Sequence, residues 1–218
     1  MRTLLDRSPA EIVQVIIIIV MSLTVHEFAH SLVTIKLGDD TPRRQGRLTL
    51  NPLAHIDLVG FIMLVIVGFG WAKPVQINPA NLKKPRRDEI LIALAGPVSN
   101  LLFAMVAVVV MAAVFSTHAL MSPSSLRDFG NFMLMLAAIN VSLAIFNMIP
   151  IPPLDGSHLV TPFLGRINTA VAATYFRYGS LLLLGIILLQ SFTRVDILHI
   201  GRITPSIVAW MLRLVGIP

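Results

Sequence analysis

Four long apolar runs dominate the sequence, and each could cross a lipid bilayer as an α-helix, which takes about 20 mostly apolar residues. These runs contain almost no ionisable side chains and cover Ile12–Ile35, Ile90–Thr117, Phe129–Leu154 and Ile167–Thr193. Two further apolar stretches, Leu58–Ala72 and Ile203–Leu212, are shorter. The sequence therefore predicts an all-α polytopic membrane protein, a bundle of four to six transmembrane helices.

The composition agrees with a chain surrounded mainly by lipid. Of the 218 residues, 56% are hydrophobic and 13% are charged, whereas soluble domains have about 25% charged residues. The net charge of +6 is expected of cytoplasmic loops rich in Lys and Arg rather than of a nucleic-acid-binding surface. The absence of cysteine excludes disulfides and thiolate metal ligands. The first run is expected to be a retained span, because no small-x-small cleavage site follows it.

The first apolar run contains the motif His26-Glu27-Phe28-Ala29-His30. Residues four apart share a helix face, so both imidazoles can bind one metal ion, and the adjacent glutamate can act as general base on a water molecule. A charged side chain at the centre of a span costs about 2.5–3.5 kcal/mol. Three ionisable residues within five positions therefore favour a metal site over the alternative, a polar cluster that hydrogen-bonds to neighbouring helices.

A catalytic zinc ion usually has three protein ligands, and in this chain the third must be His, Asp or Glu. Asp155 differs from the other acidic residues because it follows an apolar run, in the segment Asn147–Gly156. Three prolines in that segment must break the helix, and broken backbone at membrane depth is tolerated only inside protein or beside a wet cavity. Asp155 is the candidate third ligand; the alternative is that it caps a helix over 157–165.

Three motifs together resemble those of the site-2 proteases, the intramembrane zinc metalloproteases. They are HEFAH at 26–30, Ala95-Gly96-Pro97-Val98-Ser99-Asn100, and the segment 147–156, in the family's order. The stretches 47–60 and 70–75 look like the compact branch of the family, which lacks PDZ and CBS domains. We expect a single intramembrane metalloprotease domain over 1–218, with a metal-site core at about 12–165 and C-terminal spans at 167–218.

The resemblance implies one Zn²⁺ per chain, held by His26, His30 and Asp155, with Glu27 as general base. The implied reaction is hydrolysis of peptide bonds within or near transmembrane segments of other membrane proteins, through zinc-activated water. The resemblance also suggests Asn140 as a second catalytic residue, a donor to the substrate carbonyl or its oxyanion. In the middle motif, Gly96 and Asn100 are expected to allow close helix packing rather than to take part in catalysis.

Other functions stay open at this point. A membrane metallopeptidase acting on prenylated or soluble peptides would take a downstream glutamate as third ligand, and no glutamate follows Glu89. A zinc carrier or sensor would need ligands along a path, and an inactive scaffold would not need Glu27. His55 could be an extra ligand, or a loop histidine with one backbone hydrogen bond. The remaining histidines, His118, His158 and His199, have no metal-site spacing and are expected at the surface or at interfaces.

The region between the first two long runs predicts a small β or re-entrant element. Residues 46–50 and 71–75 alternate in the manner of strands, and such strands could capture an unwound substrate by edge pairing; they could equally be connecting loop. Nine of the 17 Lys and Arg residues flank Leu58–Ala72, and positively charged flanks tend to be cytoplasmic.

The metal ligands can lie at the same depth in the membrane only if the first and third long runs cross it in the same direction. We therefore predict that Leu58–Ala72 enters the membrane and returns on the same side. The N-terminus and the loop near 118–128 would be outside, and the active site would open toward the cytoplasm. A prokaryotic plasma membrane is the expected location, because the sequence shows no organelle-targeting signal.

Overall fold

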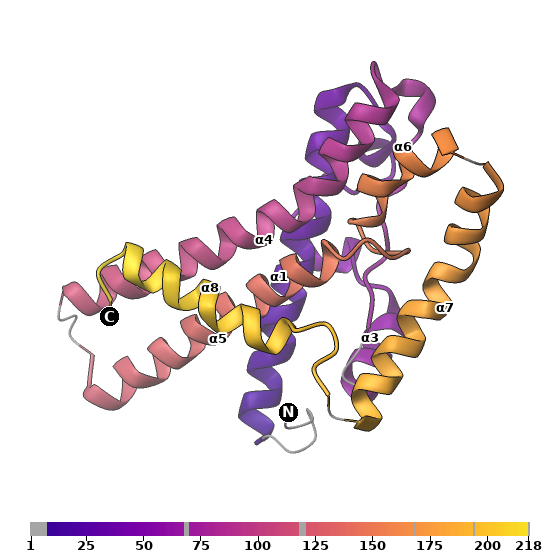
Figure 1. The fold of residues 1–218 in the computed structure, drawn as a ribbon. Helices are drawn as coiled ribbons and strands as arrows, with labels where there is room; N and C mark the ends of the chain where they lie inside the picture. Colours follow the sequence, from indigo (N-terminus) through magenta and orange to yellow (C-terminus); the bar gives the residue numbers. More distant parts are fainter. Residues whose placement is uncertain (1–7, 68–69, 118–120, 168, 194, 218) are drawn as a thin grey trace.

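The computed structural model describes residues 8–67, 70–117, 121–167, 169–193 and 195–217, and this part of the chain is mainly helical (Figure 1). The helices in chain order are α1 (Pro9–Leu37), α2 (Thr41–Arg44), η2 (Pro52–Ala54), α3 (Leu58–Val67), η3 (Pro79–Asn81), α4 (Pro85–Ser116), α5 (Pro123–Asn147), α6 (Ser157–Ile167), α7 (Thr169–Thr193) and α8 (Ile200–Leu214). Within these ranges α1, α4, α5 and α7 are long and apolar enough to cross a membrane. The four predicted spans and the all-α membrane fold are thus confirmed.

The buried core lies where α1, α4 and α5 meet, with α8 packed against α5 (Figure 1). Its members are Ile18, Ala104, Ala107, Val108, Leu136, Ala137, Val141, Val208 and Met211. Three of them are alanines, which let the helices approach closely. Lipid tails are as apolar as these side chains, so close packing and interhelical hydrogen bonds hold such helices together.

The segment after α5 leaves the helical path, as the prolines predict. α5 ends at Asn147, and the N–H of Gly156 donates to the Asn147 carbonyl over 2.7 Å, so the loop returns to the end of the helix. α7 supports the loop from outside: the Tyr175 hydroxyl donates to the Pro150 carbonyl over 2.9 Å, and Gly179 lies directly against the Pro152 ring. The loop that carries Asp155 is therefore fixed to both α5 and α7, with Pro152 and Leu154 buried.

The described parts of the segment after η2, 56–67 and 70–72, form a hairpin whose two ends meet. Ile56 and Ala72 make an antiparallel β-bridge, and the N–H of Lys73 donates to the His55 carbonyl over 2.8 Å. α3 lies within this hairpin, and its Gly60 lies so close to the returning chain that a Cβ there would overlap the Trp71 backbone. This is the shape that a re-entrant segment requires.

The predicted strands at 46–50 and 71–75 are wrong, since the described residues contain only the isolated bridge between Ile56 and Ala72. The buried side chain of Arg47 takes the place of strand pairing, because its guanidinium donates to the carbonyls of Ala54 and Lys73. Pro74 has no N–H to extend a ladder. Residues 46–50 and 71–75 therefore present no strand edge with which a substrate could pair.

Asp39 joins the end of α1 to the chain just before α4. Its side chain is fully buried and accepts hydrogen bonds from the Thr41 hydroxyl (2.5 Å), the Asn81 amide (2.8 Å) and the Asn78 N–H (2.7 Å). Burial alone would raise the pKa of this carboxyl, but the hydrogen bonds from Asn81, Thr41 and Asn78 lower the pKa to about 2. Both flanks of the 56–72 hairpin are thereby held at one end of the molecule.

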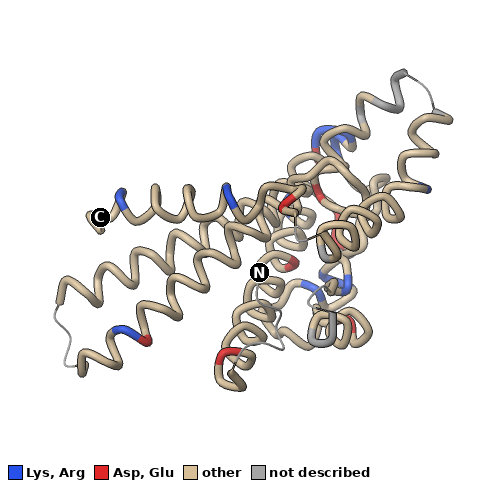
Figure 2. Tube along the Cα trace, turned by 60° about the horizontal axis from the view of Figure 1, so that its bottom comes forward, with Lys and Arg blue, Asp and Glu red and all other residues tan. Residues whose placement is uncertain are grey.

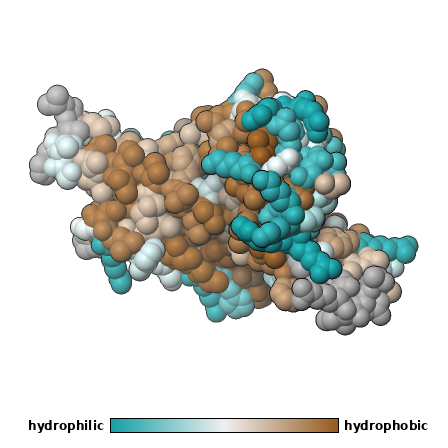
Figure 3. Space-filling view, turned by 90° about the horizontal axis from the view of Figure 1, so that it is seen from above, coloured by the Kyte–Doolittle hydropathy of each residue, from teal (hydrophilic) through white to brown (hydrophobic). Residues whose placement is uncertain are grey.

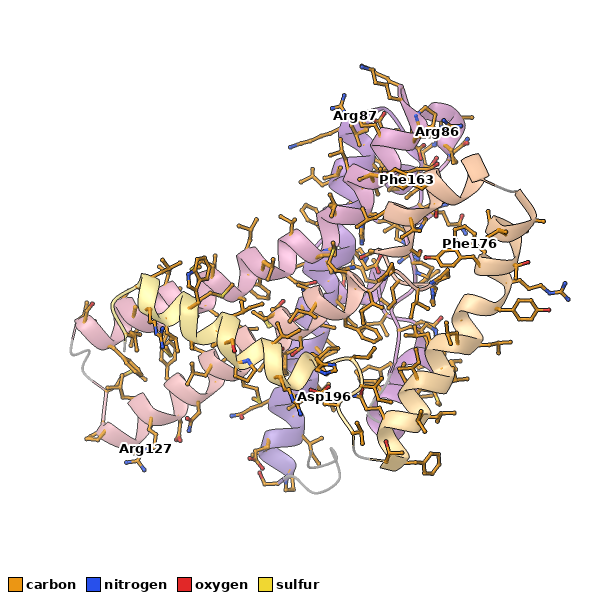
Figure 4. All side chains as sticks on the ribbon, viewed as in Figure 1. Arg86, Arg87, Arg127, Phe163, Phe176 and Asp196 are labelled. Atoms are coloured by element: carbon orange, nitrogen blue, oxygen red, sulfur yellow. The ribbon has the colours of Figure 1, made fainter. Side chains whose placement is uncertain are left out.

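The surface separates a hydrophilic end from apolar flanks. Charged residues are sparse along the long helices and gather near helix ends (Figure 2). Seen from above, the hydrophilic residues form a band beside a broad hydrophobic surface (Figure 3). Arg86 and Arg87 lie at this upper end, far from Arg127 near the start of α5 (Figure 4).

Arg177 lies within the fourth long apolar run, and the short apolar stretch Ile203–Leu212 lies near the C-terminus. α7 continues through Arg177 without a break, and the guanidinium carbon lies 5.5 Å from the centroid of the Tyr178 ring on the exposed surface. α8 has 15 residues, too few to span a bilayer. It lies against α5 instead, where the Ser142 and Thr204 hydroxyls hydrogen-bond over 3.0 Å.

The hairpin leads to a labelling prediction. Single cysteines at the exposed positions Arg44 and Lys83 of this cysteine-free chain should react with an impermeant thiol reagent from the same side of the membrane. A cysteine at the exposed Ser124 should react from the other side. Labelling of Arg44→Cys and Lys83→Cys from opposite sides would exclude a re-entrant 56–72 segment.

The buried Asp39 carboxylate leads to a pH prediction. Its pKa falls from 3.8 to about 2 on folding, so its charge stabilises the fold above about pH 4, and this contribution is lost as the pH falls toward 2. Asp39→Asn should therefore be less stable than wild type at pH 6, and the difference should shrink between pH 4 and pH 2. Thermal unfolding in detergent measures this, with Asp40→Asn at a partly exposed ion pair as control. A difference independent of pH would contradict it.

Candidate metal centre

His26 and His30 lie side by side on the face of α1 that meets α4. Both side chains are buried, and because α1 is an unbroken helix, residues four apart share a face. Their rings meet edge to face with centroids 4.6 Å apart. The two Nε2 atoms are 3.0 Å apart, so both point at the same small volume.

Asp155 reaches this volume from the proline-rich loop after α5. Its Oδ2 atom lies 3.1 Å from His26 Nε2 and 3.4 Å from His30 Nε2. α6 does begin two residues later, but only the Asp155 main-chain carbonyl bonds to it, accepting from the His158 N–H over 3.0 Å. The side chain therefore faces the histidines rather than capping the helix.

The other nitrogen of each histidine is held by an oxygen atom on α4. His30 Nδ1 lies 2.7 Å from the Ile92 carbonyl, and His26 Nδ1 lies 2.7 Å from Asn100 Oδ1. Because these oxygens can only accept, both Nδ1 atoms must donate, and in the neutral rings both Nε2 atoms carry lone pairs. Ligands of metal ions are oriented in this way.

The three atoms that converge here fit a divalent metal ion. Two nitrogen lone pairs face a carboxylate oxygen that is buried without a hydrogen-bond partner, an unfavourable arrangement unless a cation lies between them. Adjacent ligands of a tetrahedral zinc ion are about 3.3 Å apart, close to the separations of 3.0, 3.1 and 3.4 Å. His26, His30 and Asp155 are the one such group that the described residues form.

Gly96 keeps the space beside the ligand atoms open. A Cβ at this position would overlap the rings of both His26 and His30. The prediction that this glycine permits close packing therefore holds, and the neighbours it admits are the two histidines themselves. Asn100, for which only packing was expected, hydrogen-bonds directly to His26. Its spacing of four residues from Gly96, which puts both on one face of α4, was the signal that could have identified it.

Glu27 is the only acidic side chain on α1 beside the histidines. It is buried, with 9% of its surface exposed. Its carboxylate forms no hydrogen bond or ion pair among the residues that the structure describes, so its oxygens are available to another molecule. This is the state that a general base requires.

Asn140 lies on α5 at the centre of the bundle and is completely buried. Its amide nitrogen donates to the Ser22 hydroxyl over 2.8 Å and to the Leu136 carbonyl over 2.9 Å, and its oxygen accepts from Asn100 over 2.8 Å. Both N–H groups of Asn140 are therefore engaged within the protein. Its suggested role as a donor to a substrate oxyanion stays a prediction.

The other histidines lie apart from the centre. His55 is a buried loop histidine whose Nε2 lies 2.8 Å from the Thr49 carbonyl, which agrees with the second of its two predicted roles. His158 and His199 are exposed, as expected. His118 lies outside the described residues.

Comparison with known proteins gives one consistent family. The family model of peptidase family M50 matches residues 14–125 and 112–189. No solved structure matches the chain at a significant level.

The similar proteins carry protease names. YwhC of Bacillus subtilis (strain 168), a provisionally assigned zinc metalloprotease, is 39% identical over 145 residues, which cover 66% of each chain. Rip2 of Mycolicibacterium smegmatis, also a provisionally assigned zinc metalloprotease, is 28% identical over 80% of this chain and 66% of its own length. Protease RseP of Photorhabdus luminescens is 37% identical over 29% of this chain. The chain thus aligns with just under two thirds of YwhC and Rip2.

Gly96 leads to a prediction about metal binding. Gly96→Ala should favour the α4 helix by up to about 1 kcal/mol and yet lose bound zinc, because the methyl group displaces the imidazoles that their hydrogen bonds hold in place. Zinc content after dialysis measures the effect. Gly185→Ala on α7 is the control, since its Cβ meets nothing within 4 Å. Stoichiometric zinc in Gly96→Ala would show that the metal binds elsewhere.

Proposed function

This chain belongs to peptidase family M50, the site-2-protease type of membrane metalloprotease, and from that membership we propose that it hydrolyses peptide bonds within or near transmembrane segments of other membrane proteins. The observation that carries the proposal is the convergence of His26 Nε2, His30 Nε2 and Asp155 Oδ2 within 3.4 Å of one another. Glu27 follows His26 on α1, which is long enough to span a bilayer, and forms no hydrogen bond or ion pair among the described residues.

The proposed metal ion is zinc, because two imidazoles and one carboxylate are a usual ligand set for catalytic zinc. When bound, zinc would supply a Lewis acid for the scissile carbonyl and lower the pKa of a water molecule to about 7. His26, His30 and Asp155 would be the protein ligands. The single negative charge of Asp155 would offset part of the ionic charge, which makes the site tolerable in a low dielectric.

Glu27 is proposed as the group that moves protons. Its carboxylate is next to His26 in the chain and has no protein partner among the described residues, so it can accept a proton from the attacking water. The same carboxyl group can then donate that proton to the leaving nitrogen of the substrate. Burial of Glu27 limits competing water and strengthens these interactions.

The proposed substrates are transmembrane helices that unwind locally. A peptide bond within a helix is already hydrogen-bonded and is shielded by side chains, so an intact helix cannot present its carbonyl to the site. The third ligand favours this function over the prenyl-peptide type, since the ligand set is completed by Asp155 and not by a glutamate.

The proposed orientation places the active site toward the cytoplasm. His26 and His30 lie in the C-terminal half of α1, nearer the end where Arg43, Arg44 and the residues before α4 are exposed. Positively charged ends of membrane proteins are usually cytoplasmic. The N-terminus of α1 would then lie on the outer side.

Two substitutions separate the proposed roles. Glu27→Gln preserves the ligands, so zinc should stay bound while cleavage of a model transmembrane peptide falls by roughly 10²–10⁴-fold. Asp155→Ala should lose both cleavage and most of the zinc.

The measurements are peptide cleavage, with and without a chelator, and zinc content by atomic absorption. Asp128→Ala, which removes an exposed carboxylate, is the matched control and should keep both. Full cleavage by Glu27→Gln would remove Glu27 from the mechanism, and full zinc content in Asp155→Ala would remove Asp155 from the ligands.

A further inference from the structure

A chain of buried polar side chains runs through the bundle to the metal centre. It begins at Ser22 on α1, passes through Asn140 on α5 and Asn100 on α4, and ends at His26 Nδ1. Ser22, Asn140 and Asn100 are each 0% exposed. Buried polar groups are costly unless every one is satisfied, and these three leave no side-chain atom without a partner.

Main-chain carbonyls fix the direction of every hydrogen bond in this chain. Asn140 donates to the Leu136 carbonyl over 2.9 Å, and Asn100 donates to the Ser22 carbonyl over 3.3 Å. The Ser22 hydroxyl donates to the Ile18 carbonyl over 2.6 Å. A carbonyl can only accept, so the NH₂ groups of both amides must face these carbonyls.

The amide oxygens are consequently turned toward the metal centre. Asn140 Oδ1 accepts from Asn100 Nδ2 over 2.8 Å, and Asn100 Oδ1 is left facing His26 Nδ1 at 2.7 Å. If Asn100 were flipped, its oxygen would face the Ser22 carbonyl oxygen and the Asn140 oxygen. Only one proton arrangement satisfies all the groups, and in it His26 Nδ1 donates.

We propose that Asn140 and Ser22 are positioning residues for the metal centre, which act through Asn100 to hold His26 in the tautomer whose Nε2 lone pair faces Asp155 and His30. His30 is held in the same tautomer by one direct hydrogen bond, from its Nδ1 to the Ile92 carbonyl. The two ligands of one helix are thus oriented by different means, one by main chain and one by a relay from three helices. This inference rests on the proposed zinc site.

The relay accounts for Asn140 without contact to substrate. An oxyanion donor needs a free N–H directed at the substrate, whereas both N–H groups of Asn140 are bound to Ser22 and Leu136. A positioning residue needs no free N–H. The two roles predict different effects of the same substitution, because a positioning residue changes metal affinity and an oxyanion donor changes turnover alone.

The test compares zinc affinity, measured by competition with a chromophoric chelator, in Asn140→Leu, Asn100→Leu and the double variant. Loss of a partner that orients a metal-binding histidine typically lowers metal affinity by about 10- to 100-fold, and that loss is expected for Asn100→Leu. Asn140→Leu should lose about 10-fold. The double variant should lose no more than Asn100→Leu alone, because one residue acts through the other.

A matched control separates positioning from general loosening of the bundle. Ser142→Ala removes an interhelical hydrogen bond on α5, two residues from Asn140 but directed at Thr204, and should leave zinc affinity unchanged. The absorption spectrum of the Co²⁺-substituted protein should change in Asn140→Leu and not in Ser142→Ala. If Asn140→Leu does not fold, Ser22→Ala, a smaller change, decides by the same two measurements.

The outcomes also separate this inference from the proposed function. Wild-type zinc affinity in Asn140→Leu, or losses that multiply in the double variant, would overturn the relay. Unchanged affinity with reduced turnover would return Asn140 to the role of oxyanion donor. Wild-type protein that binds zinc but cleaves no transmembrane peptide would refute the proposed function, while a lowered zinc affinity in Asn140→Leu would still support the relay.

Discussion

Three lone-pair atoms that meet within 3.4 Å, on His26, His30 and Asp155, set the requirements for the rest of the bundle. Such a group is unfavourable in a low dielectric unless a cation binds to it and every neighbouring polar atom has a partner. α4 must therefore come close enough to supply oxygen atoms to both Nδ1 positions. Gly96 makes that approach possible, since any side chain there would overlap the rings.

The same requirement explains why α5 is broken where it is. A carboxylate carried by a continuous helix would be fixed by that helix's direction, whereas the proline-rich loop lets Asp155 turn back toward α1. The cost of the break is unpaired main chain, which the fold limits by hydrogen bonds from the Gly156 N–H to the end of α5 and from Tyr175 of α7 to the Pro150 carbonyl. Part of this non-helical main chain thereby finds hydrogen-bond partners within the protein, as backbone at membrane depth requires.

Two hydrogen-bonded links hold α1 to the rest of the bundle. Its C-terminal end is tied by Asp39 to the chain before α4, which keeps the 56–72 hairpin on one side and holds α1 beside α4, where the histidines meet Gly96. Near the middle of α1, Ser22 links this helix to α5 through Asn140. One helix therefore carries the two histidine ligands and part of the hydrogen-bonded frame that orients them, so ligand geometry and helix packing are coupled.

The sequence by itself determined the spans and the helix break, and it gave His26, Glu27, His30 and Asp155 as candidates for the site, because apolar length, proline chemistry and the i, i+4 spacing of the histidines are local properties. It did not determine what residues 46–50 and 71–75 form, since the alternation there is outweighed by Arg47, whose guanidinium binds the carbonyls that strand pairing would have used. Nor could it assign Asn100 to His26 or Asn140 to Asn100, because the partners are 74 and 40 positions apart. Only the crossing of α1, α4 and α5 decides which buried amide meets which, and main-chain carbonyls on those helices then decide which way each amide points.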